Sequence, residues 1–273
     1  MSEAGSAGHR AGGEILYDSF VAEYYDYAPP VAGRRDLDFF LSYAQSQGSP
    51  ILELGCGTGR VLLELARAGH RVIGLDLSGR MLAQCKEKLA ALPADAQRRV
   101  ALVQGDMTAF DLGETFRLIT IPFRPFQHLL DTEQQLACLR SAARHLAPGG
   151  KLIVDFFHTD ARRMHDPAFQ EERDAFPEFT LPDGRRVKMR DRVVAFHRAE
   201  QRNDVEMIYY VTHPGGRQER LVFAFTIRYF FRYEVEHLLA RSGFRVAALY
   251  GDFDRSPLVD TSPEMIFVAE RVP

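Results

Sequence analysis

Glycines and an acidic residue gather in one short stretch of the chain, Ile51–Arg60, which reads ILELGCGTGR. An apolar run carries Glu53 and passes into Gly55, Gly57 and Gly59, after which a helical pattern begins. Glycine permits a positive φ and lets a ligand approach the backbone closely. The free N–H groups at the start of a helix attract groups rich in acceptors. The stretch therefore predicts a strand, a tight turn and a helix that bind such a ligand.

The spacing of these glycines separates the stretch from two other nucleotide-binding turns. Dinucleotide-binding turns read G-x-G-x-x-G, and here Arg60 stands where the third glycine would be. The phosphate-binding string G-x-x-x-x-G-K-[ST] does not occur in the sequence. A glycine-rich turn between a strand and a helix with no ligand remains the alternative interpretation at this point.

Two carboxylates follow later predicted strands. Asp76 ends the strand after the glycine turn, within the roughly 20-residue distance at which a carboxylate accepts hydrogen bonds from ribose hydroxyls. Ser78 is expected to cap the next helix, which leaves Asp76 for a ligand. Asp106 follows the next predicted strand along the chain.

Strand and helix patterns alternate along most of the sequence. Strands are expected over residues 50–54, 71–77, 100–104, 116–122, 151–157, 244–250 and 264–271. Helices are expected over residues 36–47, 60–68, 78–92, 132–147 and 232–242. This alternation predicts a parallel sheet with helices on both faces, and such sheets bind ligands at the carboxyl ends of their strands.

A segment between the fifth and sixth predicted strands interrupts the alternation. Its three runs of strand character cover residues 185–196, 205–213 and 217–231, with turn signals at 182–184 and 214–216. We expect an antiparallel sheet appended to the main domain.

The string E-L-G-C-G-T-G resembles motif I of class I S-adenosylmethionine (SAM) methyltransferases, and the two downstream carboxylates extend the resemblance over residues 51–157. The resemblance implies an α/β fold with a Rossmann-like, doubly wound, seven-stranded sheet. Its strand order would be 3-2-1-4-5-7-6, with the last strand antiparallel. The appended segment is similar in layout to the β insertion of sugar-nucleotide N-methyltransferases. The expected parts are a disordered tail (1–13), N-terminal lid helices (14–48), a SAM-binding core (49–157), a substrate-covering β insertion (158–231) and a C-terminal helix and hairpin (232–273).

The resemblance also assigns cofactor contacts. Tyr17 and Tyr25 are eight residues apart, close to two helical turns, and similar Y-D…Y-D helices cover the cofactor in such enzymes. Either Arg34 or Arg35 would hold the carboxylate of the methionine part, unless both are solvated surface charges. The expected cofactor-binding residues are Tyr17, Tyr25, Arg35, Glu53, Gly55, Cys56, Gly57, Asp76, Leu77, Met81, Gly105, Asp106, Met107, Pro122 and Phe123.

The implied reaction is an SN2 displacement at the sulfonium methyl of SAM, onto a nitrogen or oxygen of a small metabolite. The protein then has to align the reacting groups and exclude water. Tyr17 and His128 are the expected catalytic residues, because histidine titrates near neutral pH. The residues expected to bind the substrate are Arg124, Gln127, His128, Arg228 and Tyr229. A histidine held by the backbone remains an alternative for His128, and an ion pair with a glutamate remains one for Arg228.

Composition narrows the choice of partners. The chain has 273 residues, 46% of them hydrophobic and 26% charged, with a net charge of −3, so no general basic field favours nucleic acid or an anionic membrane. The three cysteines lack C-x-x-C spacing, and neither a signal pattern nor a membrane-length apolar run is seen. We expect a cytoplasmic monomer or homodimer without a metal. The competing functions are an NAD(P)-dependent oxidoreductase and a non-catalytic SAM-binding regulator.

Overall fold

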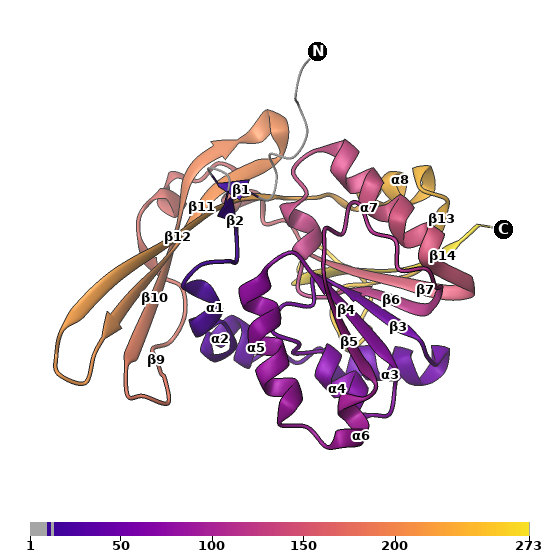
Figure 1. Cartoon of the computed structure of the whole chain (residues 1–273). Coiled ribbons are helices and arrows are strands. Elements are labelled where there is room, and N and C mark those ends of the chain that lie inside the picture. Colours follow the sequence, from indigo (N-terminus) through magenta and orange to yellow (C-terminus); the bar gives the residue numbers. More distant parts are fainter. Residues whose placement is uncertain (1–9, 12–13, 273) are drawn as a thin grey trace, which may run out of the picture. The chain divides into compact units, whose positions relative to one another are not determined.

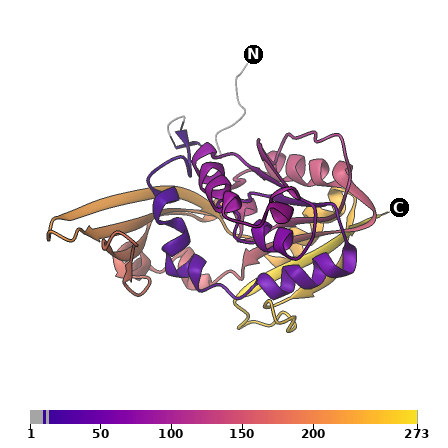
Figure 2. The ribbon, with the colours of Figure 1, turned by 60° about the horizontal axis from the view of Figure 1, so that its bottom comes forward.

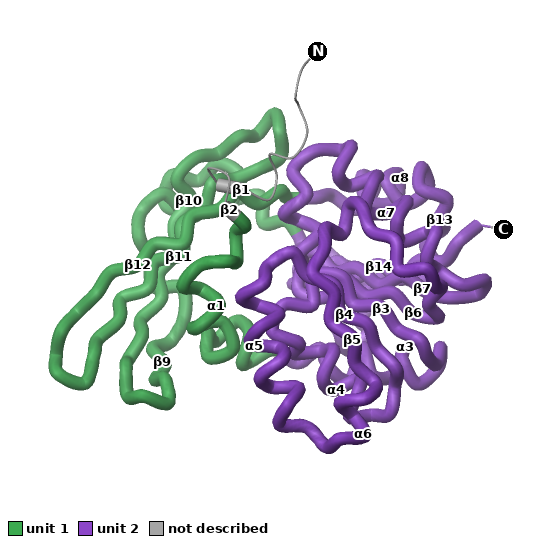
Figure 3. Tube along the Cα trace, in the orientation of Figure 1, with its two compact units in different colours: residues 1–34, 159–229 green, residues 35–158, 230–273 purple. Residues whose placement is uncertain are grey.

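Two compact units make up the chain in a computed structural model, which describes residues 10–11 and 14–272. Unit 1 contains residues 1–34 and 159–229, and unit 2 contains residues 35–158 and 230–273 (Figure 3). The expected insertion therefore lies almost wholly in unit 1, and the expected N-terminal lid segment is divided between the units. Most of the expected tail lies outside the described residues, but Arg10–Ala11 (β1) pairs with Glu14–Ile15 (β2) in an antiparallel ladder.

Unit 2 is built on a seven-stranded sheet (Figure 1). Its strands are β3 (Ile51–Leu54), β4 (Val72–Asp76), β5 (Val100–Gln104), β6 (Phe116–Ile121), β7 (Leu146–Phe157), β13 (Phe244–Tyr250) and β14 (Glu264–Arg271). They lie in the order β5-β4-β3-β6-β7-β14-β13. The first five strands of this order pair in parallel, whereas β14 is antiparallel to both of its neighbours. The predicted order 3-2-1-4-5-7-6 is confirmed.

Helices cover both faces of this sheet. They are α3 (Leu37–Gln47), α4 (Leu62–Arg67), α5 (Gly79–Ala90), α6 (Ala94–Gln97), α7 (Thr132–His145) and α8 (Arg232–Arg241). Buried side chains of α3, α4 and α5 pack with Ile51, Val72 and Leu118. Those of α7 and α8 pack with the alternate residues Leu52 and Ile119. Since successive side chains of a strand point to opposite faces, the sheet is covered on both sides.

Two local predictions in unit 2 differ from the structure. The helix expected over residues 132–147 ends at His145, and β7 begins at Leu146 because Leu146 pairs with Phe116 of β6 before the Pro148–Gly150 turn. At the start of α3, Asp36 occupies the N-cap position but makes no capping hydrogen bond, because its carboxylate is engaged elsewhere.

Unit 1 holds an antiparallel sheet, as predicted. Its strands are β8 (Arg173–Asp174), β9 (Phe179–Thr180), β10 (Arg186–His197), β11 (Arg202–Thr212) and β12 (Gln218–Arg228). They lie in the order β12-β11-β10-β8, and β9 also pairs with β10. Figure 2 shows β10–β12 (orange) as a long, extended sheet. Short 3-10 helices at Ala161–Met164, Pro167–Gln170 and Arg198–Glu200 complete the insertion.

The N-terminal part of unit 1 is not one amphipathic helix. It contains α1 (Val21–Tyr24), a 3-10 turn (Tyr25–Tyr27) and α2 (Pro29–Ala32), and Tyr17 lies in a turn before them. Ala28 is extended, with ψ 130°, because a residue before proline is driven out of the helical region. These short helices pack with Met189, Tyr209 and Phe223 in a core of their own. Among the described residues, no helix has the length and apolar character needed to cross a membrane.

Candidate cofactor site

The glycine turn takes the conformation that its sequence predicts. The φ values of Gly55, Gly57 and Gly59 are 68°, 54° and 83°. Residues with a Cβ rarely adopt this backbone conformation. A Cβ on Gly55 would lie 2.7 Å from Cγ of Pro125, and one on Gly59 would lie 2.5 Å from Sγ of Cys85. Glycine is thus required here both by the backbone and by close packing.

Asp76 lies at the end of β4 beside this turn. Its Oδ2 accepts a hydrogen bond from the Gly57 N–H over 2.7 Å, and its Oδ1 accepts one from the Ser78 N–H over 2.8 Å. Ser78 caps α5 by accepting from the Met81 N–H over 3.1 Å, as predicted. Asp76 is therefore held in one orientation beside the glycine turn.

The end of β5 lies next to the end of β4. The Gly105 N–H donates to the carbonyl of Asp76 over 2.9 Å, and Gln104 donates to the carbonyl of Leu77 over 3.1 Å. Oδ1 of Asp106 accepts from the backbone N–H and the hydroxyl of Thr108, over 2.8 and 2.7 Å. The structure thus brings Asp76, Leu77, Gly105 and Asp106 to one edge of the sheet.

Glu53 and Thr120 are buried polar residues at the ends of neighbouring strands β3 and β6. Their side chains are 2% and 0% exposed, and they are direct partners in the parallel ladder. Oε2 of Glu53 and Oγ1 of Thr120 have no hydrogen-bond partner within the part of the chain that the structure describes. Burial raises the pKa of Glu53 to about 8, and the nearby Asp36 and Asp76 act in the same direction against Arg60. Burial likewise raises the pKa of Cys56, so its thiol stays protonated.

Arg60 is a cation of the turn to which the sequence analysis gave no role. Its two terminal nitrogens donate to the two oxygens of Asp36, over 2.5 and 2.8 Å, and the Asp36 side chain is fully buried. The Arg60 guanidinium also lies 6.0 Å from the ring centre of Phe123. Arg35 is exposed, and its contact with the cofactor stays a prediction. The signal that could have revealed Arg60 is its place directly after the third glycine, inside the turn itself.

The segment after β6 is strained. Phe123 and Arg124 have φ values of 65° and 69°, which are unfavourable for residues other than glycine and recur at functional sites. The Phe123 N–H donates to Oδ1 of Asp155 over 2.9 Å, which holds this backbone in place. The Arg124 guanidinium is buried in an ion pair with Glu264 and lies 3.5 Å from the ring centre of Phe157.

These contacts bear on the residues predicted to meet the substrate. Arg124 is engaged by Glu264, and Gln127 is 2% exposed with its side-chain oxygen accepting from the Phe157 N–H over 3.0 Å. Both contacts hold the loop in place, and the roles of Arg124 and Gln127 toward the substrate stay predictions. His128 ends the short 3-10 helix η2 (Pro125–His128) and is half-buried. Its catalytic role stays a prediction.

Met81, Met107 and Pro122 also lie in unit 2, and four further predicted site residues lie in unit 1. The rings of Tyr17 and Tyr25 meet edge to face with their centres 6.1 Å apart, although no single helix carries them. Arg228 is the ladder partner of Arg202, and the Tyr229 N–H donates to the carbonyl of Gln201 over 2.9 Å. Their roles toward cofactor and acceptor stay predictions.

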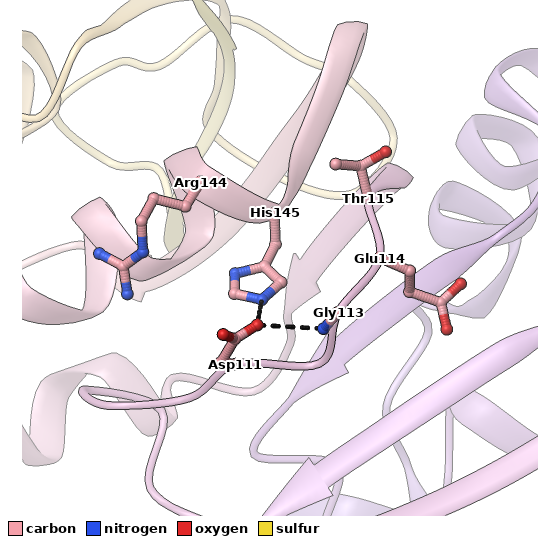
Figure 4. A pocket seen from close by; sticks show the side chains of 6 residues that line it. All are labelled: Asp111, Gly113, Glu114, Thr115, Arg144 and His145. Atoms are coloured by element: carbon pink, nitrogen blue, oxygen red, sulfur yellow. Dashed lines mark hydrogen bonds and ion pairs between the residues drawn. The ribbon is translucent and has the colours of Figure 1, made fainter.

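An open hollow of about 300 Å³ lies elsewhere in unit 2, where the chain enters β6 (Figure 4). It is lined by Asp111, Gly113, Glu114, Thr115, Arg144 and His145. The Leu112 N–H donates to Nε2 of His145, so the hydrogen-bond network assigns the proton to Nδ1, which faces the carbonyl of Ser141. The hollow is at the amino end of the parallel strands, away from the edge that such sheets use for ligands.

The strand-end edge fits the nucleoside part of SAM. Asp76 and Asp106 are the residues that would meet the ribose hydroxyls and the adenine amino group, and the glycine turn keeps the space beside them clear of any Cβ. The buried Glu53 adds an acceptor that suits a cation. Among the described residues there is no group of three or more metal-ligating side chains.

Comparisons with known proteins agree with this geometry. A family model for a methyltransferase domain matches residues 51–150. The cypemycin N-terminal methyltransferase of a Streptomyces species is 28% identical over 94% of this chain and 98% of its own. The dTDP-3-amino-3,4,6-trideoxy-alpha-D-glucopyranose N,N-dimethyltransferase of Streptomyces venezuelae is 28% identical over 86% of this chain and 91% of its own.

A solved structure gives the same result. The CcbJ methyltransferase from Streptomyces caelestis matches with a TM-score of 0.74 and 26% identity, over 94% of this chain and 98% of its own. These findings set aside the oxidoreductase and the non-catalytic regulator. The chain is an enzyme, an S-adenosylmethionine-dependent methyltransferase with a Rossmann-like fold.

Proposed function

We propose that the enzyme methylates an amine nitrogen of a small molecule. The observation that carries the proposal is that two relatives aligned over most of their length and of this chain are both named for methylation at nitrogen, one at a peptide N-terminus and one on an amino sugar. An uncharged amine is a nucleophile without prior activation, whereas a hydroxyl must lose its proton as it reacts.

The residues of the strand-end edge have defined tasks in this proposal. SAM supplies a methyl group already activated by its sulfonium, so the protein contributes binding, orientation and exclusion of water. Asp76 holds the ribose and Asp106 the adenine amino group, while the glycine turn lies against the nucleoside. The strained Phe123–Arg124 backbone, fixed by Asp155, borders the reacting groups.

His128 is the proposed proton acceptor. An amine that gains a methyl group carries one proton too many, and an imidazole is suited to remove it near neutral pH. His128→Ala is expected to lower kcat by about 10²-fold, the lower end of what a general base contributes. The Kd of the His128→Ala variant for S-adenosylhomocysteine should equal that of the wild type. An unchanged kcat would remove His128 from the mechanism.

The function is tested with methyl-labelled SAM and matched acceptors. One pair is a nucleotide-linked 3-amino sugar and its 3-hydroxy counterpart, and a second is a peptide with a free or an acetylated N-terminus. Mass spectrometry should find the label on the amino sugar or on the peptide with a free N-terminus. The hydroxy sugar and the acetylated peptide should carry no label. Label on the hydroxyl sugar alone would contradict nitrogen as the acceptor atom.

Acceptor selection by residues 158–231 remains a prediction, and Arg228 tests it. Arg228→Ala is expected to raise KM for an anionic acceptor without changing the Kd for S-adenosylhomocysteine, because only the acceptor would meet this cation. A cytoplasmic location and a monomeric or homodimeric state also remain predictions, and light scattering measures the second.

A further inference from the structure

Two buried oxygen atoms at the carboxyl edge of the sheet lack partners in the described part of the chain. They are Oε2 of Glu53 and Oγ1 of Thr120, which lie abreast on β3 and β6 and share one face of the sheet. Buried polar atoms without a hydrogen bond are rare in native proteins and call for an explanation. A group that arrives from outside would satisfy them.

The charges around Glu53 favour a cation as that group. Arg60 faces Glu53 from the glycine turn, but both of its terminal nitrogens are bonded to Asp36, the residue that begins α3. Asp36 itself and Asp76 of β4 face Glu53 with like charge, and the neighbouring Cys56 thiol is uncharged. With one cation and two carboxylates around it, the local charge is already negative while Glu53 is neutral and becomes more negative when Glu53 ionises, so an incoming positive charge would relieve it.

We propose that Glu53 holds a proton in the cofactor-free enzyme and releases it to solvent when the ammonium group of the cofactor binds, a group that SAM and S-adenosylhomocysteine share. The proposal rests on the cofactor site described above. In this step the O–H bond of the Glu53 carboxyl breaks, the proton passes to water and buffer, and the carboxylate keeps the electron pair and faces the cation. Cofactor affinity and proton release are then linked, so each must change the other by the same free energy.

The burial of Glu53 agrees with this assignment. Its pKa of about 8 keeps the carboxyl protonated at neutral pH, which a buried residue beside two carboxylates requires. Affinity for the cofactor should therefore rise with pH, by up to about tenfold per pH unit below this value, and level off above it.

The experiment is calorimetry of S-adenosylhomocysteine binding at pH 7 in phosphate and in Tris, two buffers with different ionisation enthalpies. The difference between the two observed binding enthalpies gives the number of protons released. We expect about one proton per site for the wild type, and none when the pH is well above the pKa of Glu53. Glu53→Gln should bind without releasing a proton. Glu87→Gln, a change of an exposed carboxylate on α5, should release as many as the wild type.

A second ligand separates the two ends of the cofactor. 5′-Methylthioadenosine has the nucleoside but neither the ammonium nor the sulfonium, so its binding should release no proton from Glu53. Infrared difference spectra should show loss of the protonated carboxyl band with S-adenosylhomocysteine and not with this analogue.

The outcomes are distinguishable. Binding of S-adenosylhomocysteine by the wild type with no buffer dependence overturns the inference and leaves the cofactor site standing. Equal proton release by Glu53→Gln and the wild type assigns the proton to another group and also overturns it. Absence of any binding would remove the cofactor site and the inference together.

Discussion

The carboxylate of Asp76 accepts a hydrogen bond from the backbone N–H of Gly57 over 2.7 Å, which fastens the end of β4 to the middle of the glycine turn. Asp76 thereby fixes the turn at the edge of the sheet where we propose that the cofactor binds. Such a bond to a charged acceptor contributes more than one between neutral groups.

Asp76→Ala should weaken binding of S-adenosylhomocysteine by about 1–3 kcal/mol, the scale of a lost charge-assisted hydrogen bond. Isothermal calorimetry measures the loss, and circular dichroism checks that the fold is kept. Asp95→Ala, at an exposed surface ion pair, is the control and should bind like the wild type. Equal affinities of Asp76→Ala and the wild type would remove Asp76 from the site.

Gly55→Ala should destabilise the enzyme and abolish cofactor binding, because the new methyl group would lie 2.7 Å from Cγ of Pro125 at a φ of 68°. Gly113→Ala is a matched control, since Gly113 has a φ of 66° and nothing within 4 Å of an added Cβ. It should cost only the left-handed backbone penalty of about 1–2 kcal/mol. Thermal melting compares the two variants, and similar losses would mean that packing against Pro125 is unimportant.

Arg60→Met should destabilise the protein by about 3–5 kcal/mol, since it leaves the fully buried Asp36 carboxylate without its bidentate partner. Adding Asp36→Asn to Arg60→Met should recover part of this loss, because the uncompensated charge is then gone. Arg98→Met breaks an exposed pair with Asp95 and should change stability by less than about 1 kcal/mol. Urea unfolding gives the three values. A double variant as unstable as the sum of its single changes would contradict the coupling.

Glu53 should make the cofactor-free protein less stable at alkaline pH. Its folded pKa of about 8 is above its usual 4.5, so the folded state binds the proton more tightly than the unfolded state. The stabilisation is therefore fully present below pH 4.5 and is lost as pH rises through 8. The melting temperature of Glu53→Gln should exceed that of the wild type by a margin that grows from pH 5 to pH 9. Melting curves that stay parallel over this range would show that Glu53 is ionised throughout.

The fold was largely predictable because its signals are local. Apolar runs, the Ser78 cap and the turn glycines each act over a few residues, and together they indicate alternating strands and helices. The strand order came from the resemblance to class I methyltransferases. The N-terminal segment was less predictable. The spacing of Tyr17 and Tyr25 indicates a helix, but Pro29 breaks it and packing on β11 and β12 decides its shape.

The positions of candidate site residues were predictable only where they depend on one residue and its neighbours in the sequence. Asp76 and Asp106 follow strands and lie where expected. Arg60 was missed because its partner Asp36 is 24 residues away, and sequence spacing does not reveal such a pair. The ion pair of Arg124 with Glu264 was likewise not predicted, because Glu264 is 140 residues away in the sequence.

Unit 1 is assembled from two pieces of chain, residues 1–34 and 159–229, which share a single core. Tyr24 packs against Tyr209, and Tyr17 against Phe223, so the inserted sheet and the N-terminal segment depend on each other for their packing. Transplanting the insertion alone between enzymes would leave these tyrosines against foreign partners. A graft intended to alter the choice of acceptor therefore has to carry both pieces.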